Sequence, residues 1–176
     1  MPGQTLDSAW PQLSEHVRKS CIDRITLFCK TLSTKKAGFT GGVDGKDLSE
    51  FFLTNKGDEV DDRFSHDKLL QTCTDLEMDC SEFLLYHCDL GPGNILVDVD
   101  SGVMSVIDFE CVGYVPIEWI RTKFRISSGL DLTLYDYEDE AKFAWRVGMQ
   151  KSLGLSGFAD IAERWMQSRY SKGEDV

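Results

Sequence analysis

The stretch Tyr86–Val97, YHCDLGPGNILV, places one His, one Asp and one Asn at fixed offsets and then continues into apolar residues. The three polar side chains are His87, Asp89 and Asn94. A short apolar run at residues 83–86 precedes them and predicts a strand. The stretch therefore predicts a strand, a polar loop and a second strand, and the meaning of the loop depends on what lies opposite it.

The residues after this loop predict a β-hairpin. Residues 94–99 and 103–109 are rich in strand-forming side chains, and the turn signal between them centres near Ser101. Residues whose numbers add to about twice 101 then lie opposite each other, which pairs Asn94 with Asp108. Paired residues lie roughly 5 Å apart at Cα. An amide oxygen and a carboxylate should therefore converge at the open end of the hairpin.

These oxygen-bearing side chains fit the chemistry of phosphoryl transfer. Asn94 and Asp108 offer hard oxygen ligands, which suit Mg²⁺. The tight loop at Gly91–Gly93 would hold Asp89 beside them, where its carboxylate can accept a hydroxyl proton. Phosphoryl transfer needs positioning, charge neutralisation and one base. Asp and Asn are also common in ordinary turns, so each residue alone has a structural explanation, and only the joint spacing favours a site.

The same motifs resemble those of a known enzyme family. His87–Leu96 resembles the catalytic loop of the aminoglycoside phosphotransferase and choline kinase family, whose pattern is His-x-Asp-Leu-x-Pro-x-Asn-Ile-Leu. Val106–Glu110 resembles the metal-binding strand end, the counterpart of the protein-kinase Asp-Phe-Gly. Gly113–Pro116, and Gly41–Gly45 upstream, resemble fungal members. The resemblance loosely covers most of residues 13–125.

The resemblance implies an activity and a role for each site residue. The family transfers the γ-phosphoryl group of ATP, with Mg²⁺, to a hydroxyl group of a small molecule. Asp89 would be the catalytic base, Asn94 and Asp108 would hold Mg²⁺, and His87 would mainly brace the catalytic loop. Cys88 stands where the family usually has Gly, and we expect an inert, buried thiol there.

The acceptor site in such enzymes lies in the C-terminal lobe, often among acidic side chains. Candidates for it in this chain are Asp131, Asp136, Glu138, Asp139 and Glu140. Acidic residues are also favourable at the start of a helix, so a solvated helix start explains the same cluster equally well.

The expected fold is α+β and mostly helical: a single domain over residues 1–176, resembling a protein-kinase C-lobe, in which one small β-hairpin carries the site. Apolar residues recur at helical spacing in four regions. A further helix is expected after Pro116. The four regions are 10–32, 69–76 with Ser65 as N-cap, 137–153 and 157–170.

A kinase-like enzyme also has an N-terminal lobe, with a glycine-rich loop and a strand lysine that hold the phosphates. Residues 1–86 carry neither, and Lys35, Lys36 and Lys46 fall in predicted loops. We therefore expect a C-lobe alone, with the N-lobe absent, weak ATP affinity and an exposed apolar face for a partner. That partner would be a second copy or a chain that supplies the N-lobe. The alternatives to an active phosphotransferase are a non-catalytic, pseudokinase-like binding module and a truncated family member.

Composition excludes several other functions. The 176 residues carry a net charge of −11, which disfavours binding to nucleic acid or anionic membranes. This charge would attract a cationic acceptor or a basic partner, although an acidic balance usually reflects solubility alone. Six Cys without a CxxC pair, and three His, disfavour a zinc site. The N-terminus lacks the features of a signal peptide. We therefore expect reduced thiols and a cytoplasmic location.

Overall fold

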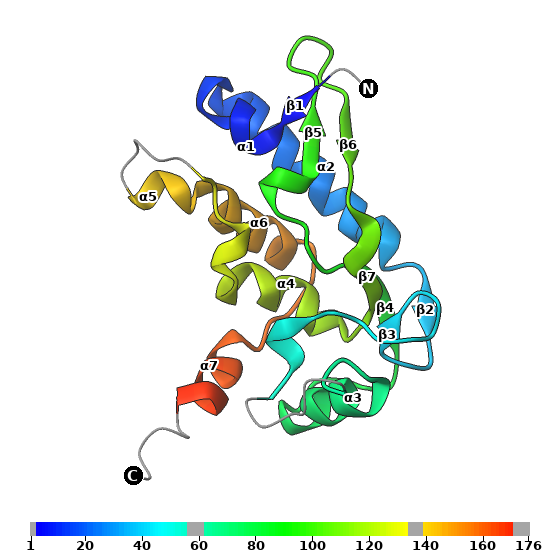
Figure 1. Ribbon diagram of the computed structural model, residues 1–176. Coiled ribbons are helices and arrows are strands. Elements are labelled where there is room, and N and C mark those ends of the chain that lie inside the picture. Colours follow the sequence, from blue (N-terminus) through cyan, green and yellow to red (C-terminus); the bar gives the residue numbers. More distant parts are fainter. Residues whose placement is uncertain (1–2, 56–61, 134–138, 171–176) are drawn as a thin grey trace.

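The computed structural model of the chain describes residues 3–55, 62–133 and 139–170. In these ranges, most helices lie to one side of two small antiparallel sheets (Figure 1). The α-helices are α1 (Leu6–Ala9), α2 (Glu15–Leu32), α3 (His66–Asp75), α4 (Ile117–Ile126), α5 (Asp139–Lys142), α6 (Ala144–Leu155) and α7 (Ala162–Tyr170). The 3₁₀ turns are η1 (Trp10–Gln12), η2 (Phe51–Leu53), η3 (Pro92–Asn94), η4 (Phe109–Cys111) and η5 (Ser128–Leu130).

The predicted hairpin is one part of a larger β arrangement. Its strands form a three-stranded sheet of order β1-β5-β6, and a second sheet has the order β2-β4-β7-β3. The sequence predicted one small β element, and the second sheet corrects this prediction. The strands are β1 (Gln4–Thr5), β2 (Lys36–Ala37), β3 (Gly41–Gly42), β4 (Phe83–His87), β5 (Ile95–Val97), β6 (Met104–Val106) and β7 (Val112–Val115).

Lys36 is a second correction, because it lies on a strand and not in a loop. It belongs to β2, where it pairs with Leu84 of β4. Its ammonium group forms an ion pair with Glu82 at 2.6 Å, and both side chains are about half exposed.

Helix α2 confirms the predicted apolar stripe but begins later than expected. Ser14 is its N-cap and accepts a hydrogen bond from the amide of Val17. The preceding residues, including Pro11, form the separate turn η1. Cys21 and Ile25 are buried on the predicted face. A proline fixes its own φ and lacks an amide hydrogen, which explains why the helix does not extend back through residue 11.

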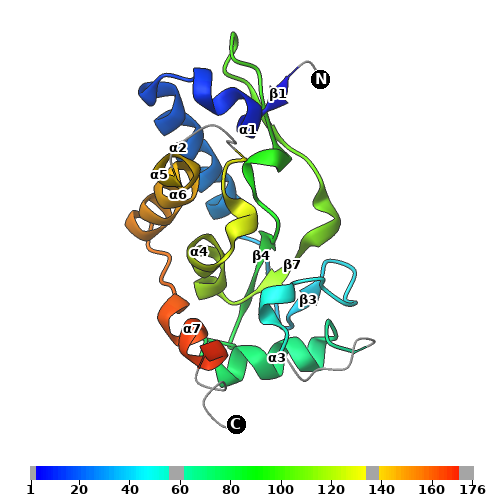
Figure 2. The ribbon, with the colours of Figure 1, turned by 60° about the vertical axis from the view of Figure 1, so that its left-hand side comes forward.

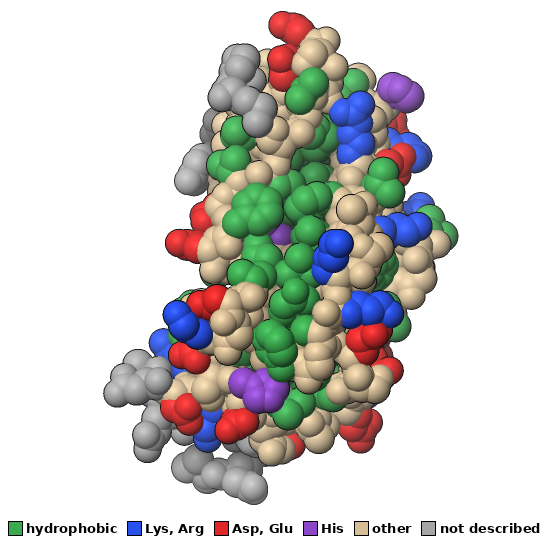
Figure 3. Space-filling view, turned by 90° about the vertical axis from the view of Figure 1, so that its right-hand side faces the viewer, with side chains coloured by type: hydrophobic (Ala, Val, Ile, Leu, Met, Phe, Trp, Pro, Cys, Tyr) green, Lys and Arg blue, Asp and Glu red, His purple; other side chains and the backbone are tan. Residues whose placement is uncertain are grey.

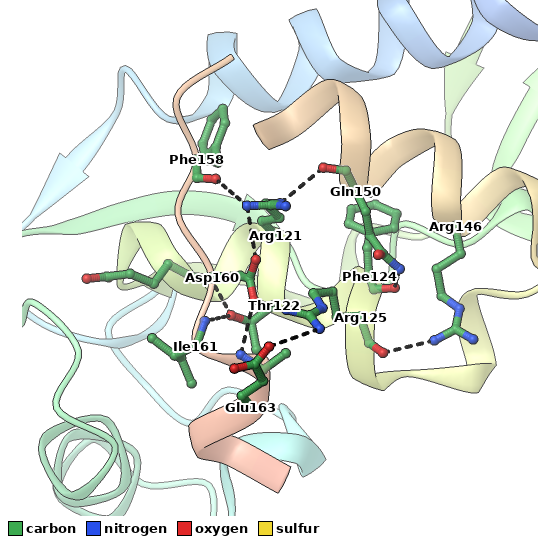
Figure 4. A network of polar contacts seen from close by, with 12 residues as sticks. Arg121, Thr122, Phe124, Arg125, Arg146, Gln150, Phe158, Asp160, Ile161 and Glu163 are labelled. Atoms are coloured by element: carbon green, nitrogen blue, oxygen red, sulfur yellow. Dashed lines mark hydrogen bonds and ion pairs between the residues drawn. The ribbon is translucent and has the colours of Figure 1, made fainter. Parts of the chain in front are cut away.

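Helix α4 is the central support of the fold. It packs against α6, α7 and β4 (Figure 2). Polar contacts fix it to its neighbours (Figure 4). Arg121 and Arg125 both bind the Asp160 carboxylate, at 3.0 and 2.9 Å. Arg121 also donates to the carbonyl of Gln150, and Arg146 donates to the carbonyl of Arg125. These contacts tie α4 to α6 and to the segment before α7.

Two glycines mark close approaches of the backbone. A Cβ on Gly113 of β7 would lie 2.4 Å from the carbonyl oxygen of Gly41 and 2.8 Å from the Leu48 side chain. A Cβ on Gly148 of α6 would lie 2.4 Å from the terminal methyl of Ile22. The first obstacle includes backbone, whereas the second is the flexible end of a side chain.

No helix in the described part of the chain is long and apolar enough to span a bilayer.

We predict that Gly113→Ala lowers the free energy of unfolding by about 1–3 kcal/mol, because β3 would have to move away from β7. Gly148→Ala should be close to neutral, because Ile22 can rotate and alanine favours the helix by roughly 1 kcal/mol. Urea unfolding of both variants measures the difference. Equal losses of stability would show that the contact between β3 and β7 is not tight.

Candidate functional site

The hairpin is present, but its register differs by one residue from the expected one. Ile95 pairs with Val106 and Val97 pairs with Met104. The amide of Ile107 donates to the carbonyl of Asn94 at 3.0 Å. Asn94 therefore lies opposite Ile107, and Asp108 is the next residue along the chain.

Asn94 and Asp89 contact each other directly. The Asn94 side-chain amide donates to the Asp89 carbonyl oxygen at 2.8 Å and to its carboxylate Oδ2 at 2.9 Å. Both acceptors are oxygens, so the hydrogen-bond pattern fixes the nitrogen of the Asn94 amide toward Asp89. The Asn94 Oδ1 must then point elsewhere, and it accepts no hydrogen bond from the described residues. Asp89 Oδ1 likewise has no hydrogen-bond partner among them.

Buried apolar neighbours hold this loop in place. Leu90 and Ile95 are fully buried, and Pro92 is buried at the start of η3. Asp89, next to them in sequence, is exposed. The alternation of anchored apolar residues with outward-facing polar ones explains how so short a loop presents a carboxylate to solvent.

His87 braces the residues on both sides of Asp108. Its ring is fully buried, and its Nε2 lies 3.0 Å from the carbonyl oxygen of Ile107. Because a carbonyl only accepts, Nε2 must carry the hydrogen. The ring also meets the Phe109 ring edge to face, with centroids 5.0 Å apart. His87 therefore contacts the residues on both sides of Asp108.

Asp108 has an unusual backbone conformation and an exposed side chain. Its φ of 62° and ψ of 66° lie in the left-handed region, which is costly for residues other than glycine and is often found at functional sites. Its carboxylate forms no hydrogen bond or ion pair with the described residues. The backbone turn and the His87 brace thus present a carboxylate that is unpaired within the described chain.

The donor set at this position suits Mg²⁺. Asn94 Oδ1 and the Asp108 carboxylate are hard oxygen atoms, and Mg²⁺ takes one or two protein oxygens together with phosphate and water. Within the described ranges, no group of three or more His, Cys, Asp or Glu side chains is placed to hold a metal ion. A site that depends on the nucleotide's phosphates for its remaining ligands is consistent with that finding.

Of the acidic candidates for the acceptor site, the structure describes the side chain of Asp131 alone. Asp131 is paired with Arg146, whose Nε lies 2.5 Å from the carboxylate, so its charge is already neutralised. Asp136 and Glu138 lie outside the described residues, and the side chains of Asp139 and Glu140 are not described either.

One interior feature was missed by sequence reasoning. Glu50 and Lys123 form a buried ion pair at 2.6 Å. Their 73-residue separation follows no local pattern, so no sequence signal could have found the pair. Cys88 is buried as expected, with 2% exposure. Burial and the Glu50 charge raise the pKa of its thiol well above the ordinary value.

Apolar side chains are exposed beside the site. Figure 3 shows hydrophobic side chains gathered in a band down this face of the molecule. Ile107 and Phe109, which flank Asp108, are 39% and 52% exposed. A groove of about 340 Å³ lies between α2 and β6 and reaches Phe109. Apolar surface of this kind is typical of a face that meets a ligand or a partner.

One comparison with known proteins finds a family match that covers the loop. Residues 47–119 match the sequence model of the Phosphotransferase enzyme family. This range contains His87, Asp89, Asn94 and Asp108. The match supports a kinase-like protein of the phosphotransferase family. Searches of curated proteins and of solved structures found no match to the chain.

We predict that Asp108→Gly leaves the free energy of unfolding unchanged or raises it by up to about 1 kcal/mol, because glycine adopts the left-handed conformation without strain. Asp108→Val should lower it, because a β-branched residue fits that conformation poorly. Urea unfolding of both variants tests this. Destabilisation by the glycine variant would show that the carboxylate supports the fold.

Proposed function

We propose that this protein transfers the γ-phosphoryl group of ATP to a hydroxyl group of a small molecule. The observation that supports this most directly is the bond of Asn94 to Asp89. With this bond in place, the Asn94 amide oxygen and one Asp89 carboxylate oxygen accept no hydrogen bond from the described residues, and both lie at the same loop. The family match over this loop supports the same reaction class.

Each side chain has a distinct role in the proposed reaction. Asp89 Oδ1 accepts the hydroxyl proton while the acceptor oxygen bonds to the γ-phosphorus and the bond to the β–γ bridging oxygen breaks. Asn94 holds the other oxygen of the Asp89 carboxylate and so orients the base. Asn94 Oδ1 and Asp108 would hold Mg²⁺, which neutralises charge on the phosphates when bound. His87 keeps Asp108 in position.

The substrate and partner remain part of the proposal. A net charge of −11 favours a cationic acceptor. The exposed side chains of Ile107 and Phe109 would contact the nucleotide or a partner that encloses it, either a second copy or a chain with a lysine-bearing lobe. The role of such a partner is to supply the positive charge that grips the phosphates.

Metal binding can be tested without any assay of activity. The chain has two asparagines, Asn55 and Asn94, so ¹⁵N-asparagine labelling gives two side-chain amide signals. Mn²⁺ with ATP should broaden the Asn94 signal and leave the Asn55 signal, which belongs to an amide bonded to Thr72, sharp. Asp108→Ala, which keeps the number of asparagines at two, should abolish the broadening.

Asp100→Ala is the matched control for this experiment, because it removes the same charge from the turn end of the hairpin. It should leave the broadening intact. Equal broadening of both signals in the wild type, or an unaltered response in Asp108→Ala, would contradict the proposed metal site.

Catalysis is tested by Asp89→Asn. We expect it to lower the rate of phosphoryl transfer by about 10²–10⁴-fold, the contribution of a general base, while nucleotide binding persists. Steady-state kinetics with a panel of hydroxyl compounds, and calorimetry with Mg–ATP, measure the two properties. Binding without any transfer in the wild type would favour the alternative of a non-catalytic binding module.

A further inference from the structure

Two cysteines lie opposite each other at the end of the ladder between β4 and β7. His87 pairs with Val112, which is the last register position of the two strands. One step beyond it, the amide of Cys88 donates to the carbonyl of Cys111 at 3.0 Å. The ladder therefore continues by one pair, in which Cys88 is opposite Cys111. Both cysteines are free thiols.

The backbone spacing of this pair suits a disulfide. Opposite residues that share a hydrogen bond in an antiparallel ladder have Cα atoms roughly 5.5 Å apart. A disulfide joins Cα atoms that are about 4.4–6.8 Å apart. The two backbones therefore already lie at a distance that a disulfide can span, and rotation of the two side chains is the main change that a bond would require.

Both side chains lie on the interior side of the ladder. Cys88 is 2% exposed and belongs to the hydrophobic core, and Cys111 is partly buried against the same core. The Cys88 thiol lies 4.0 Å from the carbonyl oxygen of Tyr86. Tyr86 is two residues before Cys88, so its carbonyl faces the same strand as the Cys88 amide, which is β7. The thiol is therefore on the side of β4 where Cys111 lies.

The charges around the two thiols agree with this placement. Burial raises the pKa of both thiols, and the Glu50 carboxylate raises both further. The charge of Lys123 acts on both in the opposite direction. Shared charged neighbours are consistent with two sulfurs in one interior region. The placement itself rests on the ladder and on the burial of the two side chains.

The pair also encloses the candidate site along the chain. Asp89 directly follows Cys88, and Asp108 lies three residues before Cys111. A bond between the two cysteines would close a covalent ring of residues 88–111, which also contains Asn94 and the whole hairpin. Oxidation would thus join the two ends of the segment that carries the site.

We propose that Cys88 and Cys111 form a reversible disulfide, which makes this pair a redox modification site beside the Asp89 loop. Disulfides in the cytosol are usually transient and serve catalysis or redox sensing. Formation of the bond is independent of the proposed function. Its effect on phosphoryl transfer rests on that function, because the ring matters for the reaction only if Asp89 is the base.

A small-molecule disulfide, oxidised glutathione, is the oxidant. The thiolate of Cys111, the more exposed cysteine, attacks one sulfur of oxidised glutathione, whose S–S bond breaks and releases one glutathione thiolate. The Cys88 thiolate then attacks the Cys111 sulfur and releases the second glutathione. Two protein thiols are oxidised to one disulfide, and one glutathione disulfide is reduced to two thiols. The protons lost by the two cysteines end on the two glutathione thiols.

Peptide mapping of the full chain tests the pair. The protein is incubated with oxidised glutathione until its free-thiol count is constant, because thiolates are the reacting form and burial makes them scarce. Remaining thiols are alkylated, and cleavage after acidic residues then releases Cys88 in residues 83–89 and Cys111 in residues 111–118. We expect these peptides to be joined without reductant and separate with it. The free-thiol count should fall from six to four, because one bond consumes two thiols.

Three variants show whether the bond is specific. Cys111→Ser removes the exposed thiol and should leave Cys88 unmodified. Cys88→Ser removes the second attacking group, so glutathione should stay attached to Cys111. The matched control is Cys80→Ser, because Cys80 is half-buried like Cys111. This control should leave the joined peptides at the wild-type yield.

The outcomes separate the two proposals. Six remaining thiols, a bond between two other cysteines in place of this one, or glutathione that stays on Cys111 of the wild type would overturn the disulfide. If the joined peptides form while Mn²⁺ with ATP does not broaden the Asn94 signal, the disulfide stands and the proposed function fails. Where both hold, the oxidised protein should transfer phosphoryl groups more slowly, because small displacements of a catalytic group are costly, and dithiothreitol should restore the rate.

Discussion

The hydrogen bond from His87 to the carbonyl of Ile107 joins the two sheets at the residue before Asp108. His87 ends β4 of one sheet, and Ile107 follows β6 of the other. The bonds of Asn94 to Asp89 and of the Ile107 amide to the Asn94 carbonyl join the same two segments at the exposed side. The buried imidazole adds the interior link that relates the end of β4, before Asp89, to the residue before Asp108.

The polar residues of the site depend on apolar neighbours for their geometry. Leu90 and Ile95 are fully buried on either side of the loop, and Phe109 packs on the His87 ring. The direction of each polar side chain follows from an adjacent residue that cannot leave the core or its ring contact. This explains how a left-handed aspartate, which is disfavoured by its own backbone, persists at the surface.

Much of this arrangement can be predicted from the sequence. The remaining features cannot be predicted, and the reasons are physical. The stripe through Cys21 and Ile25 gives α2, and the turn near Ser101 gives the hairpin, because both rest on local periodicity. The predicted register of the hairpin was wrong by one residue, because an approximate turn centre does not determine the register. Strands of two residues, such as β2 with Lys36, carry no periodic signal. The ion pair of Glu50 with Lys123 depends on tertiary contact alone. The identity of the loop residues was readable, but their bond to each other was not.

The far end of the hairpin has a practical consequence. Its turn, residues 98–102, is separated from Asn94 by the full length of β5, and Arg24 of α2 holds it through the carbonyl of Gly102. Exposed loop tips tolerate added residues best. A fluorophore or affinity tag inserted beside Ser101 would therefore sit on a hairpin that is anchored to α2. The paired strands β5 and β6 would separate the label from the candidate site.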